Sequence, residues 1–179
     1  MIAKILIGLA LALAILVVVI MVQPCDFSVY RTILIFSPAS TVFSYVYDFH
    51  HWSKWSPWAK LDPNMKEVYE GSASGPGAVY FWSGDNKVGE GRMTIRESRP
   101  AEHLVIHLEF LKPFEATNTT EFSFKPEGAQ TQVTWSMHGK SNFLSKAMGL
   151  FMNMDKMIGA DFEKGLAQLK ATSESAPKL

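Results

Sequence analysis

The run from Ile5 to Val22 constrains this chain most, because it holds no charged or polar side chain over 18 residues. An apolar run of this length is typical of a membrane-spanning helix. At about 1.5 Å of rise per residue the run extends roughly 27 Å, close to the roughly 30 Å of a bilayer's hydrocarbon core. We therefore predict an N-terminal transmembrane anchor over residues 1–24.

A cleaved signal peptide is the alternative interpretation, because Lys4 before an apolar stretch also fits that pattern. Two details favour a retained anchor. The stretch is longer than the usual core of a signal peptide, and residues 21–25 lack the small residues that signal peptidase recognises. Cys25 leaves lipoprotein processing open, although residues 22–24 make a poor site for it. The slight excess of positive charge before the run favours a single-pass protein whose domain lies outside the cytoplasm, in the periplasm of a bacterium.

The charge beyond Val22 is nearly balanced, with 16 lysine and arginine residues against 17 acidic ones. This balance argues against a nucleic-acid partner and against a polybasic lipid-binding patch. About 150 residues is a typical length for one domain. We predict one domain over residues 25–171 and a flexible polar tail over residues 172–179. A single cysteine, Cys25, excludes an internal disulfide.

Segments of strand composition alternate with short breaks of turn residues along the domain. Phe27–Phe36 predicts a strand, and Val42, Phe43, Val46 and Phe49 then recur at helical spacing. Six further segments have strand composition, namely Lys66–Glu70, Ala78–Trp82, Val88–Glu97, His103–Phe110, Ala116–Phe124 and Thr131–His138. Because the breaks between these six are tight, we expect mostly antiparallel pairing between neighbours.

Alternation within the strands predicts one buried and one solvated sheet face. The even-numbered residues from Leu104 to Phe110 share one face, and His107 and Glu109 share the other. Near the C-terminus, apolar residues at intervals of three and four predict one helix of roughly five to seven turns. Its stripe consists of Leu144, Met148, Phe151, Met154, Ile158, Phe162, Leu166 and Leu169. This helix should lie against the apolar sheet face, and Gly149, Gly159 and Gly165 indicate a close approach to the sheet or a bend.

The order of these elements resembles the START-like helix-grip fold, an α+β architecture. The segments that carry the resemblance to the polyketide cyclase/dehydrase and lipid-transport branch of the SRPBCC superfamily are Trp55–Trp58, Tyr80–Gly84, Val88–Ile95, Thr134–Met137 and Met154–Gly159. The resemblance covers Phe27 to Lys170 and implies a deep apolar cavity between the concave face of the sheet and the C-terminal helix. It transfers no catalytic residue, because the matching positions are glycines, aromatics and methionines.

No set of residues in the sequence predicts a metal, a cofactor or a catalytic centre. Adjacent residues such as His50 and His51 rarely converge on one ion, and no other ligand stands at suitable spacing. His107 and Glu109 share a strand face as an acid/base pair would, but we expect that face to be solvated. The glycine-rich Gly71–Gly77 lacks the following Gly-Lys-Ser/Thr of a phosphate-binding loop, so it predicts a hairpin loop.

The three neighbouring tryptophans Trp52, Trp55 and Trp58 suit either ligand stacking or core packing, and we favour core packing. Asn118 and Thr120 share a face with Phe122 and Phe124, so they are the polar groups expected to point inward. The predicted cavity lining is Tyr80, Trp82, Met93, Leu108, Asn118, Thr120, Phe122, Trp135, Met137, Met154, Ile158 and Phe162.

These patterns favour a membrane-anchored domain that binds or moves a small hydrophobic molecule, of lipid or isoprenoid type, without a cofactor. Two alternatives stay open. One is a cyclase or dehydrase acting on a polyketide-like substrate, which needs an ionisable group aimed into the cavity. The other is an interaction module of the chaperone-cofactor type, which needs an exposed apolar patch on the outer sheet face.

Overall fold

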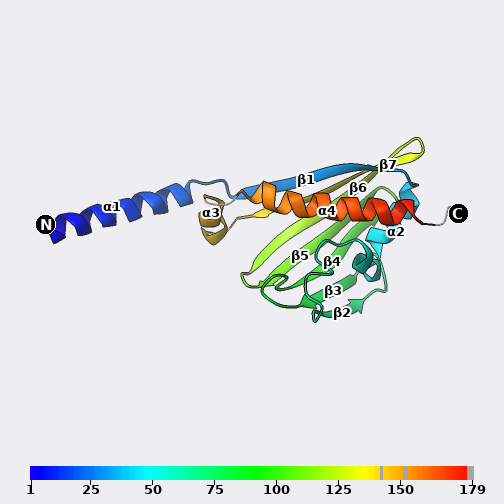
Figure 1. Cartoon of the computed structure of the whole chain (residues 1–179), viewed down its shortest axis with the longest axis horizontal. Helices are drawn as coiled ribbons and strands as arrows, with labels where there is room; N and C mark the ends of the chain where they lie inside the picture. The colour runs from blue at the N-terminus through cyan, green and yellow to red at the C-terminus, as the bar shows by residue number, and fades with distance from the viewer. Residues whose placement is uncertain (142, 151–152, 177–179) are drawn as a thin grey trace.

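The computed structural model describes residues 1–141, 143–150 and 153–176, and Figure 1 shows the chain. The helices are α1 (Ile2–Met21), α2 (Ala39–Tyr47), the 3-10 helix η1 (Phe49–Lys54), α3 (Phe143–Gly149) and α4 (Met154–Glu174). The strands are β1 (Asp26–Ile35), β2 (Lys66–Gly71), β3 (Ala78–Ser83), β4 (Glu90–Arg99), β5 (His103–Lys112), β6 (Ala116–Glu127) and β7 (Gln130–Lys140). The seven predicted strands are confirmed, with ends that differ by at most three residues.

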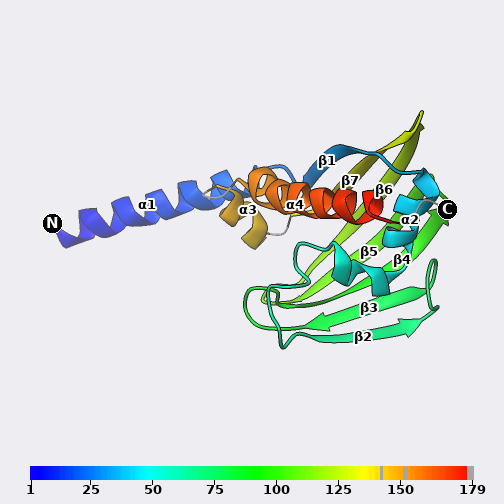
Figure 2. The same ribbon diagram turned by 45° about the vertical axis from the view of Figure 1, so that its right-hand side comes forward.

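These seven strands form one antiparallel sheet in the order β1-β7-β6-β5-β4-β3-β2. Strands β2 to β7 follow one another through tight connections, so each pairs with its neighbour in sequence. Strand β1 lies at the opposite edge from β2, and α2 and η1 carry the chain between these edges. The sheet curves around α4 (Figures 1 and 2), which confirms the helix-grip architecture.

The core lies between the concave face of the sheet and α4. Leu104 and Ile106 of β5 are fully buried, as the alternation predicted, whereas His107 and Glu109 lie on the outer face and keep about a quarter of their surface exposed. The outer face therefore carries the polar half of the strand pattern. Phe162 of α4 stacks on Trp135 of β7 with ring centroids 4.1 Å apart, which joins the helix to the sheet.

The prediction of one uninterrupted C-terminal helix was wrong, because the chain forms α3 and α4 as separate helices. Asn153 begins α4 as its N-cap, since its side-chain oxygen accepts a hydrogen bond from the Lys156 amide at 3.0 Å, and Asp155 stands in the first turn. Phe151 of the predicted stripe lies outside the described residues, as do the side chains of Leu144 and Met148. At its other end α4 continues to Glu174, past the start of the predicted tail.

Two glycines let α4 approach the sheet, as their positions predicted. A Cβ at Gly165 would lie 2.8 Å from the Trp135 ring, and a Cβ at Gly159 would collide with the Arg31 guanidinium. In contrast, no atom lies within 4 Å of a Cβ placed on Gly149 of α3. The close approach of α4 thus depends on the missing side chains of Gly159 and Gly165.

Side chains of α4 also cover the free edge of β1. Lys170 donates to the Leu34 carbonyl at 2.8 Å, and Glu174 accepts from the Phe36 amide at 2.7 Å. An edge strand otherwise presents backbone groups that can pair with another chain. The helix therefore protects this edge as well as the core.

Helix α1 projects away from the domain and buries only Ile20 (Figure 1). Its 20 residues are long and apolar enough to cross a membrane, by length and composition alone. A signal sequence near an N-terminus meets the same criterion. Four residues, 22–25, separate α1 from β1.

Candidate functional site

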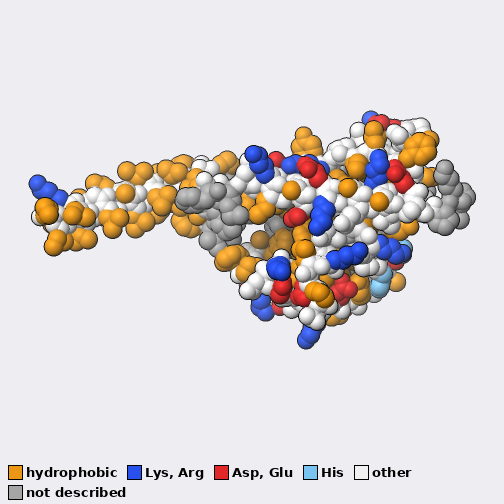
Figure 3. All heavy atoms as spheres, in the orientation of Figure 1, with side chains coloured by type: hydrophobic (Ala, Val, Ile, Leu, Met, Phe, Trp, Pro, Cys, Tyr) orange, Lys and Arg blue, Asp and Glu red, His pale blue; other side chains and the backbone are white. Residues whose placement is uncertain are grey.

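Figure 3 shows a hollow in the molecular surface below the N-terminal half of α4, and hydrophobic side chains are visible inside it. The strands in register below this half of the helix bring Met93, Leu108, Asn118 and Gly139 into one row across β4, β5, β6 and β7. Apolar side chains with one amide among them make this row suitable for an apolar guest.

The predicted lining residues separate into two groups by exposure. The first group keeps 6–8% of its surface accessible and consists of Tyr80, Trp82, Met93, Leu108, Asn118 and Met137. Met154 and Ile158 on α4 are half-buried. These eight residues come from β3 to β7 and from the start of α4.

The second group is packed more completely. Its members, Thr120, Phe122, Trp135 and Phe162, are 0–3% exposed. The Trp135 ring lies between Phe162 and Phe122, whose centroids are 4.1 Å and 4.9 Å away. Trp55 and Trp58 meet the edge of this stack at 5.6 Å and 5.7 Å from the Trp135 centroid. These tryptophans therefore pack in the core, as the sequence favoured.

The two inward polar residues differ in how their hydrogen bonds are satisfied. Thr120 donates from Oγ1 to the Ser136 carbonyl at 3.1 Å and accepts from the Trp135 indole at 3.4 Å. Within the described part of the chain, the Asn118 amide makes no hydrogen bond, although this residue is only 6% exposed. The amide keeps some access to solvent, because among the described residues Ser173 Oγ is the one fully buried side-chain N or O atom without a partner. Asn118 is thus the polar group on this face that is available to a ligand.

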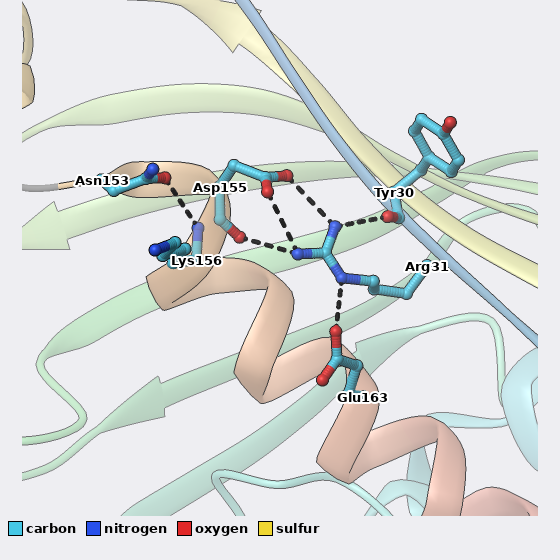
Figure 4. A network of polar contacts seen from close by, with 6 residues as sticks. All are labelled: Tyr30, Arg31, Asn153, Asp155, Lys156 and Glu163. Carbon is cyan, nitrogen blue, oxygen red and sulfur yellow. Dashed lines mark hydrogen bonds and ion pairs between the residues drawn. The ribbon is translucent and has the colours of Figure 1, made fainter.

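Arg31 is a charged residue on the inner face that the sequence analysis missed. Its guanidinium donates to Glu163 Oε1 at 2.7 Å, to the Tyr30 carbonyl at 2.7 Å, and to the Asp155 carboxylate and carbonyl at 3.1–3.2 Å (Figure 4). These five contacts use all five N–H donors of the side chain. Hydrogen bonds from Arg31 hold the pKa of Asp155 below its usual value, and hydrogen bonds to Asp155 and Glu163 raise the pKa of Arg31.

The Arg31 network fastens the first turns of α4 to β1, beside the hollow. A groove of about 340 Å³ runs along this edge and is lined by Arg31, Thr32, Ile33, Glu163 and Leu166. The alternation of β1 could have revealed Arg31, because it occupies the same face as Val29, which is buried. With every donor occupied, Arg31 positions the helix and has no free N–H for a substrate.

A second polar group lies at the β2 edge, where the sequence analysis predicted Tyr80 and missed Glu67 and Tyr69. The Tyr80 hydroxyl donates to Glu67 Oε1 at 2.7 Å, and Tyr69 donates to Glu67 Oε2 at 3.4 Å. Burial, and then the hydrogen bond to Glu67, raises the pKa of Tyr80, while burial is also the first cause that raises the pKa of Tyr69 to about 12. Both phenols therefore stay protonated and donate hydrogen bonds at neutral pH.

The histidines have ordinary partners. His50 lies 2.8 Å from Asp48 and stacks on Tyr69, while the ring of His51 bonds to the Ser44 carbonyl at 3.1 Å. His107 lies 3.9 Å from Glu109, whose carboxylate pairs with Arg92 at 2.8 Å. Among the described residues, no group of three histidine, cysteine or acidic side chains is arranged to hold a metal ion.

Comparison with known proteins places this geometry in a family. The model of the family described as "Polyketide cyclase / dehydrase and lipid transport" matches residues 26–174. No curated protein matches the sequence.

Solved structures share the fold at low sequence identity. CV1439 from Chromobacterium violaceum superposes with a TM-score of 0.60 and 14% identity over 86% of this chain and 100% of its own. The Aha1 dimer protein from Colwellia psychrerythraea superposes with a TM-score of 0.57 and 13% identity over 85% of this chain and 99% of its own. StfQ, a di-domain ARO/CYC from the steffimycin biosynthetic pathway, superposes with a TM-score of 0.59 and 12% identity over 84% of this chain and 51% of its own. This chain thus spans about half of the di-domain protein, and these similarities show the fold alone.

Proposed function

Because the chain belongs to the polyketide cyclase/dehydrase and lipid-transport family, we propose that it binds a small hydrophobic molecule of lipid or isoprenoid type in the hollow beneath α4. The observation that carries this proposal is the contrast in exposure along the inner face. Tyr80, Trp82, Met93, Leu108, Asn118 and Met137 keep 6–8% of their surface accessible, whereas Thr120, Phe122, Trp135 and Phe162 keep 0–3%. Apolar burial, at about 25 cal/mol per Å², then supplies most of the affinity, so binding resists salt.

The amide of Asn118 orients the ligand in this proposal. It is the inward polar group without a hydrogen-bond partner among the described residues, and Gly139 leaves room for it, since a Cβ there would collide with Asn118 Oδ1. A ligand with one hydroxyl or carbonyl group would satisfy this amide on binding. The preferred guest is therefore an amphiphile with a small polar head.

Helix α1 holds this domain on a bilayer, with the domain outside the cytoplasm. The length and composition of α1 support the anchor, and the positive charge that precedes it supports the orientation. A reporter that is active only in the cytoplasm, fused after Leu179, should stay silent. A strong signal would refute the orientation, and a mature protein beginning near Cys25 would refute the anchor.

Ligand binding is tested by filling the hollow. In nanodiscs the full chain should take up the neutral probe N-phenyl-1-naphthylamine above the level of empty discs, and Ile158→Trp should abolish that excess because the indole occupies the space at the start of α4. Leu34→Trp, an exposed position on the outer face, is the matched control and should bind normally. Equal uptake by Ile158→Trp and the native chain would refute the assigned site.

A cyclase-type enzyme is the second candidate, and the Tyr80–Glu67 hydrogen bond favours it. A protonated phenol on a carboxylate is an acid/base arrangement, and it lies on the inner face of β3 beside Met93. If a substrate is turned over, Tyr80→Phe and Glu67→Gln should each abolish turnover and retain probe uptake. If His107→Ala loses turnover instead, the chemistry lies on the outer face. That result would refute the roles assigned to Tyr80 and Glu67.

A further inference from the structure

The short connection between α1 and β1 determines which end of the domain faces the bilayer. Residues 22–25 can span at most about 14 Å when fully extended. Lys146 of α3 also donates to the Met21 carbonyl at 3.4 Å and contacts Cys25 Sγ at 3.1 Å. If α1 is embedded as proposed above, the end of the domain that holds Asp26 and α3 must lie next to the membrane surface.

The antiparallel register brings other elements to this same end. Asp26 at the start of β1 pairs with Lys140 at the end of β7, and Asn118 near the start of β6 pairs with Gly139. Phe110 near the end of β5 pairs with Ala116, so the β5–β6 hairpin turns here. Figures 1 and 2 both show this hairpin and α3 at the end from which α1 leaves.

Large apolar side chains are exposed at this end. Leu111 and Phe114 of the hairpin, Phe143 of α3 and Met157 of α4 are 41–54% exposed, and we call these four residues the anchor-side rim. Aromatic and aliphatic side chains at such a position are typical of protein surfaces that rest in the headgroup region of a bilayer. Of the lysines at this end, Lys112 is paired with Glu90 at 2.9 Å, and Lys146 bonds to the Met21 carbonyl at 3.4 Å.

We propose that the anchor-side rim is a membrane-contact surface that lies in the interfacial region of the bilayer holding α1. The proposal rests on the anchoring proposed above and adds to it a fixed orientation of the domain. The hollow beneath the start of α4 lies at this end of the domain. In this orientation the hollow is therefore close to the headgroup region, where an amphiphilic ligand resides.

The experiment compares two hairpins at opposite ends of the sheet. In a Cys25→Ser background, Phe114→Cys on the β5–β6 hairpin and Ala129→Cys on the β6–β7 hairpin are each labelled with a nitrobenzoxadiazole dye in the full chain. The labelled chains are reconstituted in phosphatidylcholine vesicles that contain a headgroup-spin-labelled lipid. We expect strong quenching at position 114 and several-fold weaker quenching at position 129, both unchanged by 0.5 M salt.

The possible outcomes distinguish the anchor-side rim from the α1 anchor on which it rests. Chains that resist carbonate extraction but show equal, weak quenching at both positions would overturn the rim while the anchor stands. Chains released by carbonate would overturn the anchor and the rim together. Quenching that requires phosphatidylglycerol and disappears in 0.5 M salt would show that the lysines make the contact and would also overturn the apolar rim.

Discussion

Replacing Gly159 by alanine should have opposite effects on stability depending on the residue at position 31. In the native chain a Cβ at position 159 would collide with the guanidinium of Arg31. The guanidinium cannot move aside freely, because all of its donors are bonded to Asp155, Glu163 and the Tyr30 carbonyl. Relief of the collision therefore requires that some of these bonds break.

The magnitude follows from two opposing effects. Alanine in a helix interior is more favourable than glycine by about 1 kcal/mol. With Arg31→Ala the collision disappears, so Gly159→Ala should then stabilise the chain by about this amount. With Arg31 present the displaced ion pairs should outweigh the gain, and Gly159→Ala should destabilise the chain. The sign of the effect thus reports the coupling between positions 31 and 159.

The assay is urea unfolding of the full chain in detergent, followed by tryptophan fluorescence, for the native chain, both single variants and the double variant. Trp135 is a suitable reporter because it stacks on Phe162 of α4. Gly149→Ala is the matched control, since no atom lies within 4 Å of a Cβ there, and it should not destabilise. Equal stabilisation by Gly159→Ala in both backgrounds would refute the claim that Arg31 requires a glycine opposite it.

Two further predictions concern the same helix. Phe162→Ala removes a fully buried ring, so it should lower the free energy of unfolding by about 3–5 kcal/mol and the melting temperature by several degrees or more. The control Phe114→Ala, at an exposed position, should change either quantity little. Equal effects of the two variants would mean that α4 is not packed as described. Because the hydrogen bond from Arg31 lowers the pKa of Asp155 below its usual value, the stability from their pairing is present above that usual value and is lost as the pH falls through the lowered pKa. Asp155→Asn should therefore flatten the decline of melting temperature between pH 5 and pH 3, and an unchanged slope would contradict this assignment.

The sequence by itself determined the apolar N-terminal helix, the seven strands and the faces of those strands. Each follows from local chemistry: an unbroken apolar run, turn residues between β-branched segments, and an alternation of period two. The alternation was enough to assign Asn118 and Thr120 to the inner face, where both are buried. The helical spacing of apolar residues, in contrast, predicted one helix where there are two. It continues on both sides of Asn153, although Asn153 is the N-cap at which α4 begins.

Only the tertiary structure decided which inward residues keep some exposure and which are fully packed. Phe122 and Met137 have the same strand pattern, yet Phe122 stacks against Trp135 while Met137 keeps some exposure, because α4 and the tryptophan segment cover one end of the sheet. Similarly, four of the five hydrogen bonds of Arg31 go to Asp155 and Glu163, which lie more than a hundred positions away in sequence. Long-range packing selects these contacts, and no local pattern of residues encodes how far a covering helix extends over the sheet.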